Sequence, residues 1–144
     1  MLDDLTLPAR IFRPGSTHGE TLLSHIVTIK TQIRDTAGVA AACRRLALPG
    51  PVHGTARLYS GQATGLLVQF PGWLYPIVID PATGTIRYDN YGGCWGDEQH
   101  LHRLLQAYVV ERARIEARKK NFVTNEQSLA DGSIVVEIEV GGHA

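Results

Sequence analysis

The chain has 144 residues, of which 44% are hydrophobic and 19% are charged, as is typical of one globular domain. Its 14 basic and 14 acidic residues cancel, so we expect no binding to nucleic acid and no attraction to an anionic membrane surface. The apolar runs are too short to span a bilayer. Two cysteines, Cys43 and Cys94, without C-x-x-C spacing suit a reducing compartment. We therefore expect a soluble cytoplasmic protein.

The first 23 residues differ from the rest of the chain. They contain Pro8, Pro14 and two glycines, and they show no sustained hydrophobic period. They also lack the basic start and the apolar stretch of a secretory signal. We predict a flexible N-terminal extension over residues 1–23, whose deletion leaves the melting temperature nearly unchanged, and a single domain over residues 24–144.

The domain begins with a predicted strand and a predicted helix. Residues 24–33 alternate apolar and polar side chains, which indicates a strand. A helix follows, with its N-cap at Asp35 or Thr36 and its end near Leu46. Pro49 prevents its continuation.

Four short strands are predicted next, over residues 54–59, 65–70, 74–80 and 85–91. Short loops join them, which favours an antiparallel meander. The strand over 65–70 is nearly all apolar, so we expect it to be central. Pro76 inside the next strand predicts an edge strand or a bulge.

A long helix and a hairpin complete the chain. Residues 97–120 show an apolar stripe at helical spacing, and Asp97 is the predicted N-cap. A weak strand over 122–129 leads to a turn over 130–133. Residues 134–140 alternate cleanly and predict a half-buried last strand.

These elements predict an α+β fold in the order β-α-β-β-β-β-α-β-β. Strands that follow one another closely in sequence pair as neighbours, so we expect one antiparallel or mixed sheet. The two amphipathic helices must bury their apolar stripes, and we expect both to pack on one face of that sheet.

Functional-looking side chains gather where the fifth predicted strand runs through Gly92-Gly93 into the long helix. Asp and Asn beside paired glycines can bond their own backbone and build a corner. Tyrosine and tryptophan with amide and carboxylate groups are also typical of contact surfaces. Both interpretations stay open here, and the candidate binding residues are Tyr88, Asp89, Asn90, Tyr91, Trp95 and Asp97.

Cys94 is the strongest indication of an enzyme. Gly-Gly-Cys-Trp before a helix resembles the papain-type cysteine-protease signature, and a helix N-terminus lowers a thiol pKa. That protease order needs a histidine more than a hundred residues downstream, whereas 50 residues follow Cys94 here. We predict a non-catalytic loop cysteine and assign no catalytic residue.

Metal and phosphate sites are not expected either. His100 and His102 are two residues apart on a helix, so they point in different directions. They do not belong to a common set of the three or four ligands that zinc requires. The glycines before Asp97 lack both G-x-G-x-x-G and the P-loop lysine, and the acidic residues there repel phosphate. We therefore predict no metal and no cofactor.

Two motifs, S-H-I-V-T-I-K-T from Ser24 and Y-D-N-Y-G-G-x-W-G from Tyr88, carry a resemblance. The chain resembles the hypothetical chloroplast reading frame 35 family, also called domain of unknown function 1257, over about residues 24–140. This family occurs in bacteria, including cyanobacteria, and in algal plastids. The resemblance implies a soluble cytoplasmic or stromal protein with no catalytic residues to carry over. Bacterial members often lie beside a gene for a small second protein and sometimes an ATPase, which implies a complex.

Two positions depart from that family. Residues 1–23 are unexpected, because Leu23-Ser24-His25 stands where family members begin with Met-Ser-His. Cys94 occupies a position that varies in the family and is often charged, which further disfavours a cysteine enzyme. The sequence thus predicts a non-catalytic protein-interaction module that binds a protein partner through the residues from Tyr88 to Trp95. The alternative is an enzyme or small-ligand-binding protein that uses Asp89, Asn90 and Cys94.

Overall fold

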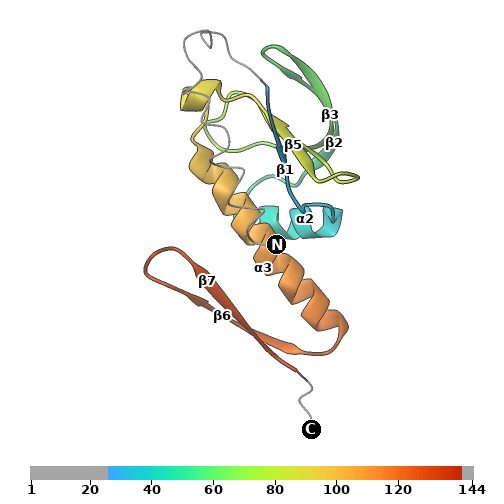
Figure 1. The fold of residues 1–144 in the computed structure, drawn as a ribbon, viewed down its shortest axis with the longest axis vertical. Coiled ribbons are helices and arrows are strands. Elements are labelled where there is room, and N and C mark those ends of the chain that lie inside the picture. The colour runs from blue at the N-terminus through green and yellow to red at the C-terminus, as the bar shows by residue number, and fades with distance from the viewer. Residues whose placement is uncertain (1–25, 141–144) are drawn as a thin grey trace.

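The computed structural model describes residues 26–140, so the predicted extension over 1–23 lies outside the described residues (Figure 1). The elements in chain order are β1 (Val27–Lys30), α2 (Thr36–Arg45), β2 (Val52–Leu58), β3 (Gly61–Val68), β4 (Ile77–Asp80), β5 (Thr85–Tyr88), a 3₁₀ turn (Tyr91–Gly93), α3 (Glu98–Lys119), β6 (Val123–Ser128) and β7 (Ile134–Glu139). The predicted α+β class and the order β-α-β-β-β-β-α-β-β are confirmed. Within these residues, neither helix is both long enough and apolar enough to cross a membrane.

The main sheet has five antiparallel strands in the order β1-β5-β4-β3-β2. The predicted meander is confirmed, since β2 to β5 follow one another across the sheet. The strand with Pro76 was expected at an edge or with a bulge, and this prediction is wrong. Pro76 lies just before β4, so it removes no ladder hydrogen bond, and β4 is the middle strand. The strand predicted to be central, β3, begins four residues earlier, at Gly61, and lies next to the edge.

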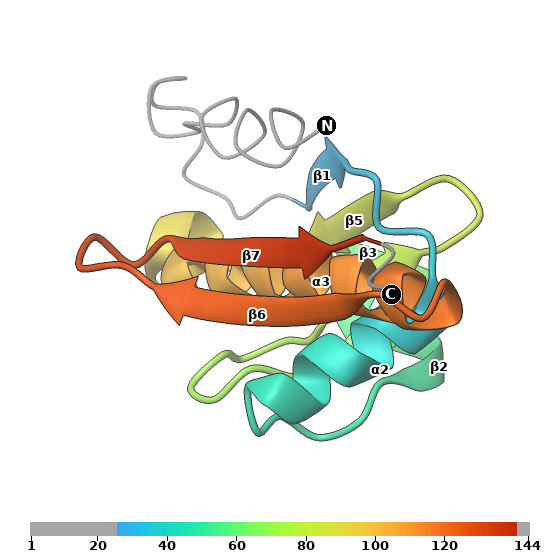
Figure 2. The same ribbon diagram turned by 90° about the horizontal axis from the view of Figure 1, so that it is seen from below.

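The last two strands form a separate two-stranded hairpin and do not join the main sheet. Figure 2 shows this hairpin lying across α3, with the helix between it and the main sheet. The hairpin is held there by side chains: Glu126 forms ion pairs with Arg45 of α2 and Arg114 of α3, and Gln106 Nε2 donates to the Gly132 carbonyl at 2.9 Å. The molecule therefore has three layers: sheet, helices and hairpin.

The predicted cap at Asp97 is confirmed, and of the two candidates for the first helix, Asp35 and Thr36, the cap is Asp35. Asp35 Oδ1 accepts from the Ala37 N–H at 3.0 Å, and Asp97 Oδ1 accepts from the Gln99 N–H at 3.0 Å. Each aspartate satisfies one of the backbone donors that a helix leaves without a partner in its first turn. Asn121, at φ 61°, follows the last turn of α3 and turns the chain toward β6.

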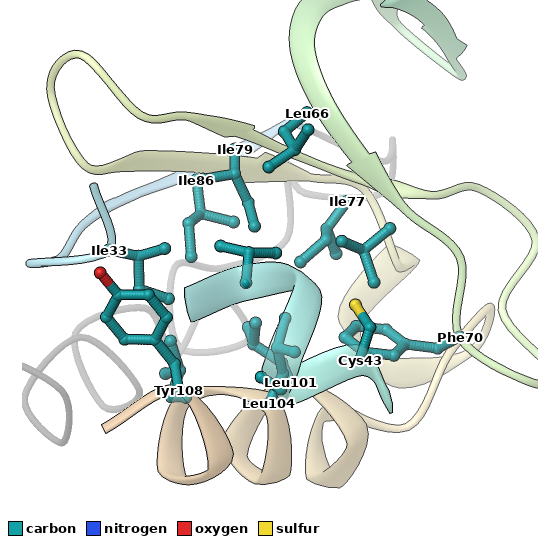
Figure 3. Close-up of a cluster of buried hydrophobic side chains, with 14 of the residues drawn as sticks. Ile33, Cys43, Leu66, Phe70, Ile77, Ile79, Ile86, Leu101, Leu104 and Tyr108 are labelled. Atoms are coloured by element: carbon teal, nitrogen blue, oxygen red, sulfur yellow. The ribbon is translucent and has the colours of Figure 1, made fainter. Parts of the chain in front are cut away.

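The core lies between the main sheet and the two helices, which cover the same face of the sheet (Figure 3). Ile79 and Ile86 from the sheet and Leu104 from α3 are fully buried there. The Tyr108 hydroxyl accepts from the backbone N–H groups of Arg34 and Asp35, at 3.2 and 3.0 Å, so it ties α3 to the start of α2.

A smaller apolar cluster covers the opposite face of the sheet. It consists of Ala56, Leu58, Ala63 and Val78, with Ile26, Leu67 and Tyr75 packed against it. Only the second half of β3 pairs with β4. The half of the β2–β3 hairpin that is nearest its turn therefore extends past the sheet. Because its residues belong to this cluster, the free half of the hairpin lies back over the outer face.

Candidate functional site

A group of aromatic side chains lies on the surface where the free end of the β2–β3 hairpin meets the loop after β5. Trp95 is at its centre: its ring centroid is 4.7 Å from that of Tyr91, 5.4 Å from that of Tyr59 and 5.9 Å from that of Tyr75. The Tyr91 ring is stacked on the indole, and the other two are inclined to it. We call Tyr59, Tyr75, Tyr91 and Trp95 the aromatic platform.

The platform is accessible to solvent. Tyr59 is 58% exposed and Tyr91 is 38% exposed, and Leu74 beside them is 57% exposed. Trp95 and Tyr75 are half-buried. Aromatic side chains of this size are usually covered in folded chains, because each buries a large apolar area. An exposed group of them is the kind of surface that marks a contact site.

Three loops bring the platform together. Tyr59 begins the turn between β2 and β3, Tyr75 lies between β3 and β4, and Tyr91 and Trp95 lie between β5 and α3. The hairpin can reach Trp95 because Gly65 packs directly against the backbone of β4, where a Cβ atom would collide with the Ile79 carbonyl oxygen. A glycine is required at that close approach.

The six predicted binding residues separate into two groups. Tyr91 and Trp95 are at the surface, in the platform. Tyr88, Asp89 and Asn90 are each 1% exposed, so the rest of the molecule covers them in this conformation. Asp97 is exposed, and its carboxylate caps α3.

Asn90 holds the loop that carries Trp95. Its carbonyl oxygen accepts from the N–H groups of Gly93 and Trp95, at 3.0 and 2.9 Å, and its side-chain Nδ2 donates to the Gly96 carbonyl at 3.0 Å. A buried amide with several hydrogen bonds fixes the loop in one arrangement. The Leu74 N–H donates to the Trp95 carbonyl at 2.9 Å and joins this loop to the one before β4.

Tyr88 and Trp73 support the same loop from inside. The Tyr88 hydroxyl donates to Glu98 Oε2 at 3.1 Å. Burial, and then the charge of Glu98, raise the pKa of Tyr88 far above its usual value, so it stays protonated and remains a donor. The Trp73 Nε1–H donates to the Asp97 carbonyl at 3.1 Å, and its ring fills the space where a Cβ at Gly96 would lie.

The backbone under the platform has an unusual conformation. Tyr91, Gly92 and Gly93 have φ values of 50°, 62° and 103°. The left-handed region is accessible to glycine without cost, but for tyrosine it is uncommon and costs about 1 kcal/mol. Non-glycine residues held in this region gather at functional sites, because the surrounding structure must compensate for the strain.

The two cysteines lie in different environments. Cys94 is exposed in this loop, while burial raises the pKa of the Cys43 thiol. Within residues 26–140, no three histidine, cysteine or acidic side chains lie together in a way that could hold a metal ion.

Sequence reasoning missed Tyr59. The available signal was a large aromatic residue directly before the predicted turn at Ser60-Gly61. Residues in and beside turns are usually small and polar, so an aromatic residue there is unusual. Its contact with Trp95 depends on the course of the β2–β3 hairpin, which no local pattern encodes. Comparisons of the chain with protein-family models, with curated proteins and with solved structures found no match.

Proposed function

We propose that this chain is a non-catalytic interaction module that binds a protein partner through the aromatic platform. The observation that carries the proposal is the contact of three tyrosines with Trp95 on an exposed surface built by three loops. Tyrosine and tryptophan are enriched at protein interfaces and at the few positions that carry most of the binding energy.

The platform suits an apolar or aromatic anchor from a partner better than it suits a buried small ligand. Its rings are in contact with one another, with centroids 4.7 to 5.9 Å apart, so no open cage lies between them. Tyrosine and tryptophan also combine a large apolar ring with a hydroxyl or an indole N–H that can bond to a partner, which suits them to interfaces.

The buried residues have a supporting role in this proposal. Asn90 and Tyr88 hold the loop from inside, so the platform exists before the partner arrives. A preorganised surface loses little conformational entropy on binding and gains affinity for that reason. The resemblance to a family without assigned activity agrees with a non-catalytic role. It also suggests the partner: a small protein encoded by a neighbouring gene, or an ATPase.

The proposal is tested by capture of the native partner from the host with tagged full-length protein. We expect one or more proteins to be retained by the wild type and lost from both Trp95→Ala and Tyr59→Ala. The matched control is Val52→Ala, because Val52 is 62% exposed and lies outside the platform. Partners retained equally by the wild type and both platform variants would contradict the proposal.

A further inference from the structure

The outer edge of β7 is the second surface of interest. β7 pairs with β6 along one edge, and no other described strand lies beside it (Figure 2). The Leu129 N–H donates to the Ser133 carbonyl at 2.8 Å, and hydrogen-bonded and non-hydrogen-bonded pairs alternate from there along an antiparallel ladder. Ile134, Val136 and Ile138 therefore direct their N–H and C=O groups away from β6. Within residues 26–140, these groups have no hydrogen-bond partner.

This edge lacks several of the features that usually prevent strands from pairing between molecules. Such edges are normally short, interrupted by a bulge, or marked by proline or charged residues, above all lysine. β1, one edge of the main sheet, has four residues and ends in Lys30, and β2, the other edge, contains Gly54 and Arg57. β7 has six residues, reads I-V-V-E-I-E, pairs with β6 without a bulge and contains neither lysine nor proline. Its charged residues, Glu137 and Glu139, are confined to its second half.

The apolar side chains of β7 are also less covered than the sequence predicted. The last strand was expected to be half-buried along its length, and for its second half this prediction is wrong. Ile134 and Val136 are half-buried, but Ile138 is 42% exposed and Val140 is 70% exposed. The cause is the isolated position of the hairpin, which rests on one helix and has no second sheet to cover it.

We propose that β7 pairs antiparallel with β7 of a second copy of this chain, with each Val136 opposite its counterpart. This register places residues with outward N–H and C=O groups opposite one another, as a hydrogen-bonded ladder requires. Ile134 then faces Ile138 of the other copy, so the apolar stripe continues across the contact. The two hairpins become one four-stranded sheet, which is more stable than an isolated hairpin.

The charges on β7 favour this register and this occupant. With Val136 on the twofold axis, Glu137 faces Val135 of the other copy and Glu139 faces Ser133, so no carboxylate faces another. A twofold axis at Glu137 places two glutamates directly opposite, and an axis at Ile138 pairs Glu137 with Glu139 twice. Like charges directly opposite are destabilising. Of these three registers, only the one centred on Val136 keeps the glutamates apart, so the strand can pair with itself there, which favours a second copy as the occupant.

The first test compares dimerisation of the wild type with that of variants that carry a negative or a positive charge at Val135. Light scattering and sedimentation measure the mass of the full chain from micromolar to submillimolar concentration, with a thiol reductant present. The wild type is expected to be a concentration-dependent dimer. Val135→Glu places a carboxylate opposite Glu137 of the other copy twice per dimer and weakens dimerisation by about tenfold. Val135→Lys removes the same apolar side chain but forms opposite-charge pairs, and it dimerises more tightly than Val135→Glu. A monomeric wild type, or equal dimerisation of the two variants, overturns the proposal.

A cross-linking test keeps the proposal falsifiable if a charge at Val135 prevents folding. In a Cys94→Ser background, Val136→Cys places two thiols across the twofold axis, where the Cα atoms are about 5.5 Å apart and within disulfide range. Glu139→Cys is the matched control, because its two copies are about 20 Å apart in this register. Covalent dimers from Val136→Cys alone support the proposal. Absence of cross-linking, or equal cross-linking at both positions, overturns it.

Discussion

The ring of Tyr59 lies 5.4 Å from that of Trp95, although the two residues belong to different loops and Tyr59 is at the tip of a hairpin that pairs with the sheet only at its other end. The contact joins the free end of the β2–β3 hairpin to the loop before α3. Tyr59 is also the most exposed of the four residues of the aromatic platform. The proposed binding surface therefore depends on the position of the hairpin as well as on the loop.

Gly65→Ala tests the glycine on which that position depends. The added methyl group collides with the Ile79 carbonyl oxygen, a backbone atom that cannot move without disturbing β4. We expect a loss of stability of about 1–3 kcal/mol, typical of overpacking, together with weaker partner binding. Chemical denaturation measures the first effect. Gly50→Ala is the control, since no described atom lies within 4 Å of its added Cβ, and unchanged stability of Gly65→Ala would contradict this account.

Gly92→Val tests the backbone of the loop. Gly92 has φ 62°, and no described atom lies within 4 Å of a Cβ placed there, so any effect comes from conformation alone. We expect the free energy of unfolding to fall by about 1 kcal/mol or more. Gly92→Asn is expected to cost less, because asparagine tolerates this region better than a β-branched residue. Equal stability of the wild type and the valine variant would show that the loop relaxes freely.

Tyr88→Phe removes the hydroxyl that donates to Glu98. At neutral pH we expect a loss of about 1 kcal/mol, as for other single hydrogen bonds. Burial and Glu98 raise the pKa of Tyr88 in the folded state above its ordinary value of 10.0. Its contribution is therefore complete below pH 10 and decreases as the pH rises further, because ionisation then favours the unfolded chain. Urea denaturation should show the variant and the wild type converging above pH 10, and a constant difference would contradict this.

Glu126→Gln tests how the hairpin is held on the helices. The hydrogen bond from Arg45, followed by that from Arg114, lowers the pKa of Glu126 below its ordinary value of 4.5. The ion pairs therefore stabilise the fold above about pH 4.5, and this contribution is lost as the pH falls through the folded-state pKa. We expect the variant to lose about 1 kcal/mol at pH 7 and to approach the wild type in acid. A difference independent of pH would mean that packing, and not charge, holds β6.

Much of the fold follows from local sequence. Asp97 was predicted as a cap, and Asp35 was one of two candidates with Thr36, because capping is a bond between a side chain and the backbone two residues later. Pro76 was misleading because β4 begins three residues later than predicted. A proline inside a strand indicates an edge or a bulge, but Pro76 lies before the strand and indicates neither. The separation of β6 and β7 from the main sheet depends on where α3 ends, and the periodicity of the strands contains no information on that.

The candidate site was only partly accessible to sequence reasoning. Tyr91 and Trp95 were found because they lie next to Gly92-Gly93, a local signal for a turn. The sequence could not show that Tyr91 and Trp95 lie at the surface while Asp89 and Asn90 are buried. Exposed and buried residues alternate regularly in helices and strands, but they follow no regular spacing in an irregular loop. Tyr59 was missed because its place in the platform depends on long-range packing.

The most direct test of the central claim is the dissociation constant of the purified partner for the wild type and for Tyr59→Ala, with the melting temperature of each protein measured alongside. Tyr59 is exposed at a hairpin tip, so the substitution should change the melting temperature little. If the platform binds the partner, the dissociation constant rises by about 30-fold, the effect of losing an aromatic residue that carries much of the binding energy. An unchanged dissociation constant in a variant that folds like the wild type would contradict the proposal that this surface binds the partner.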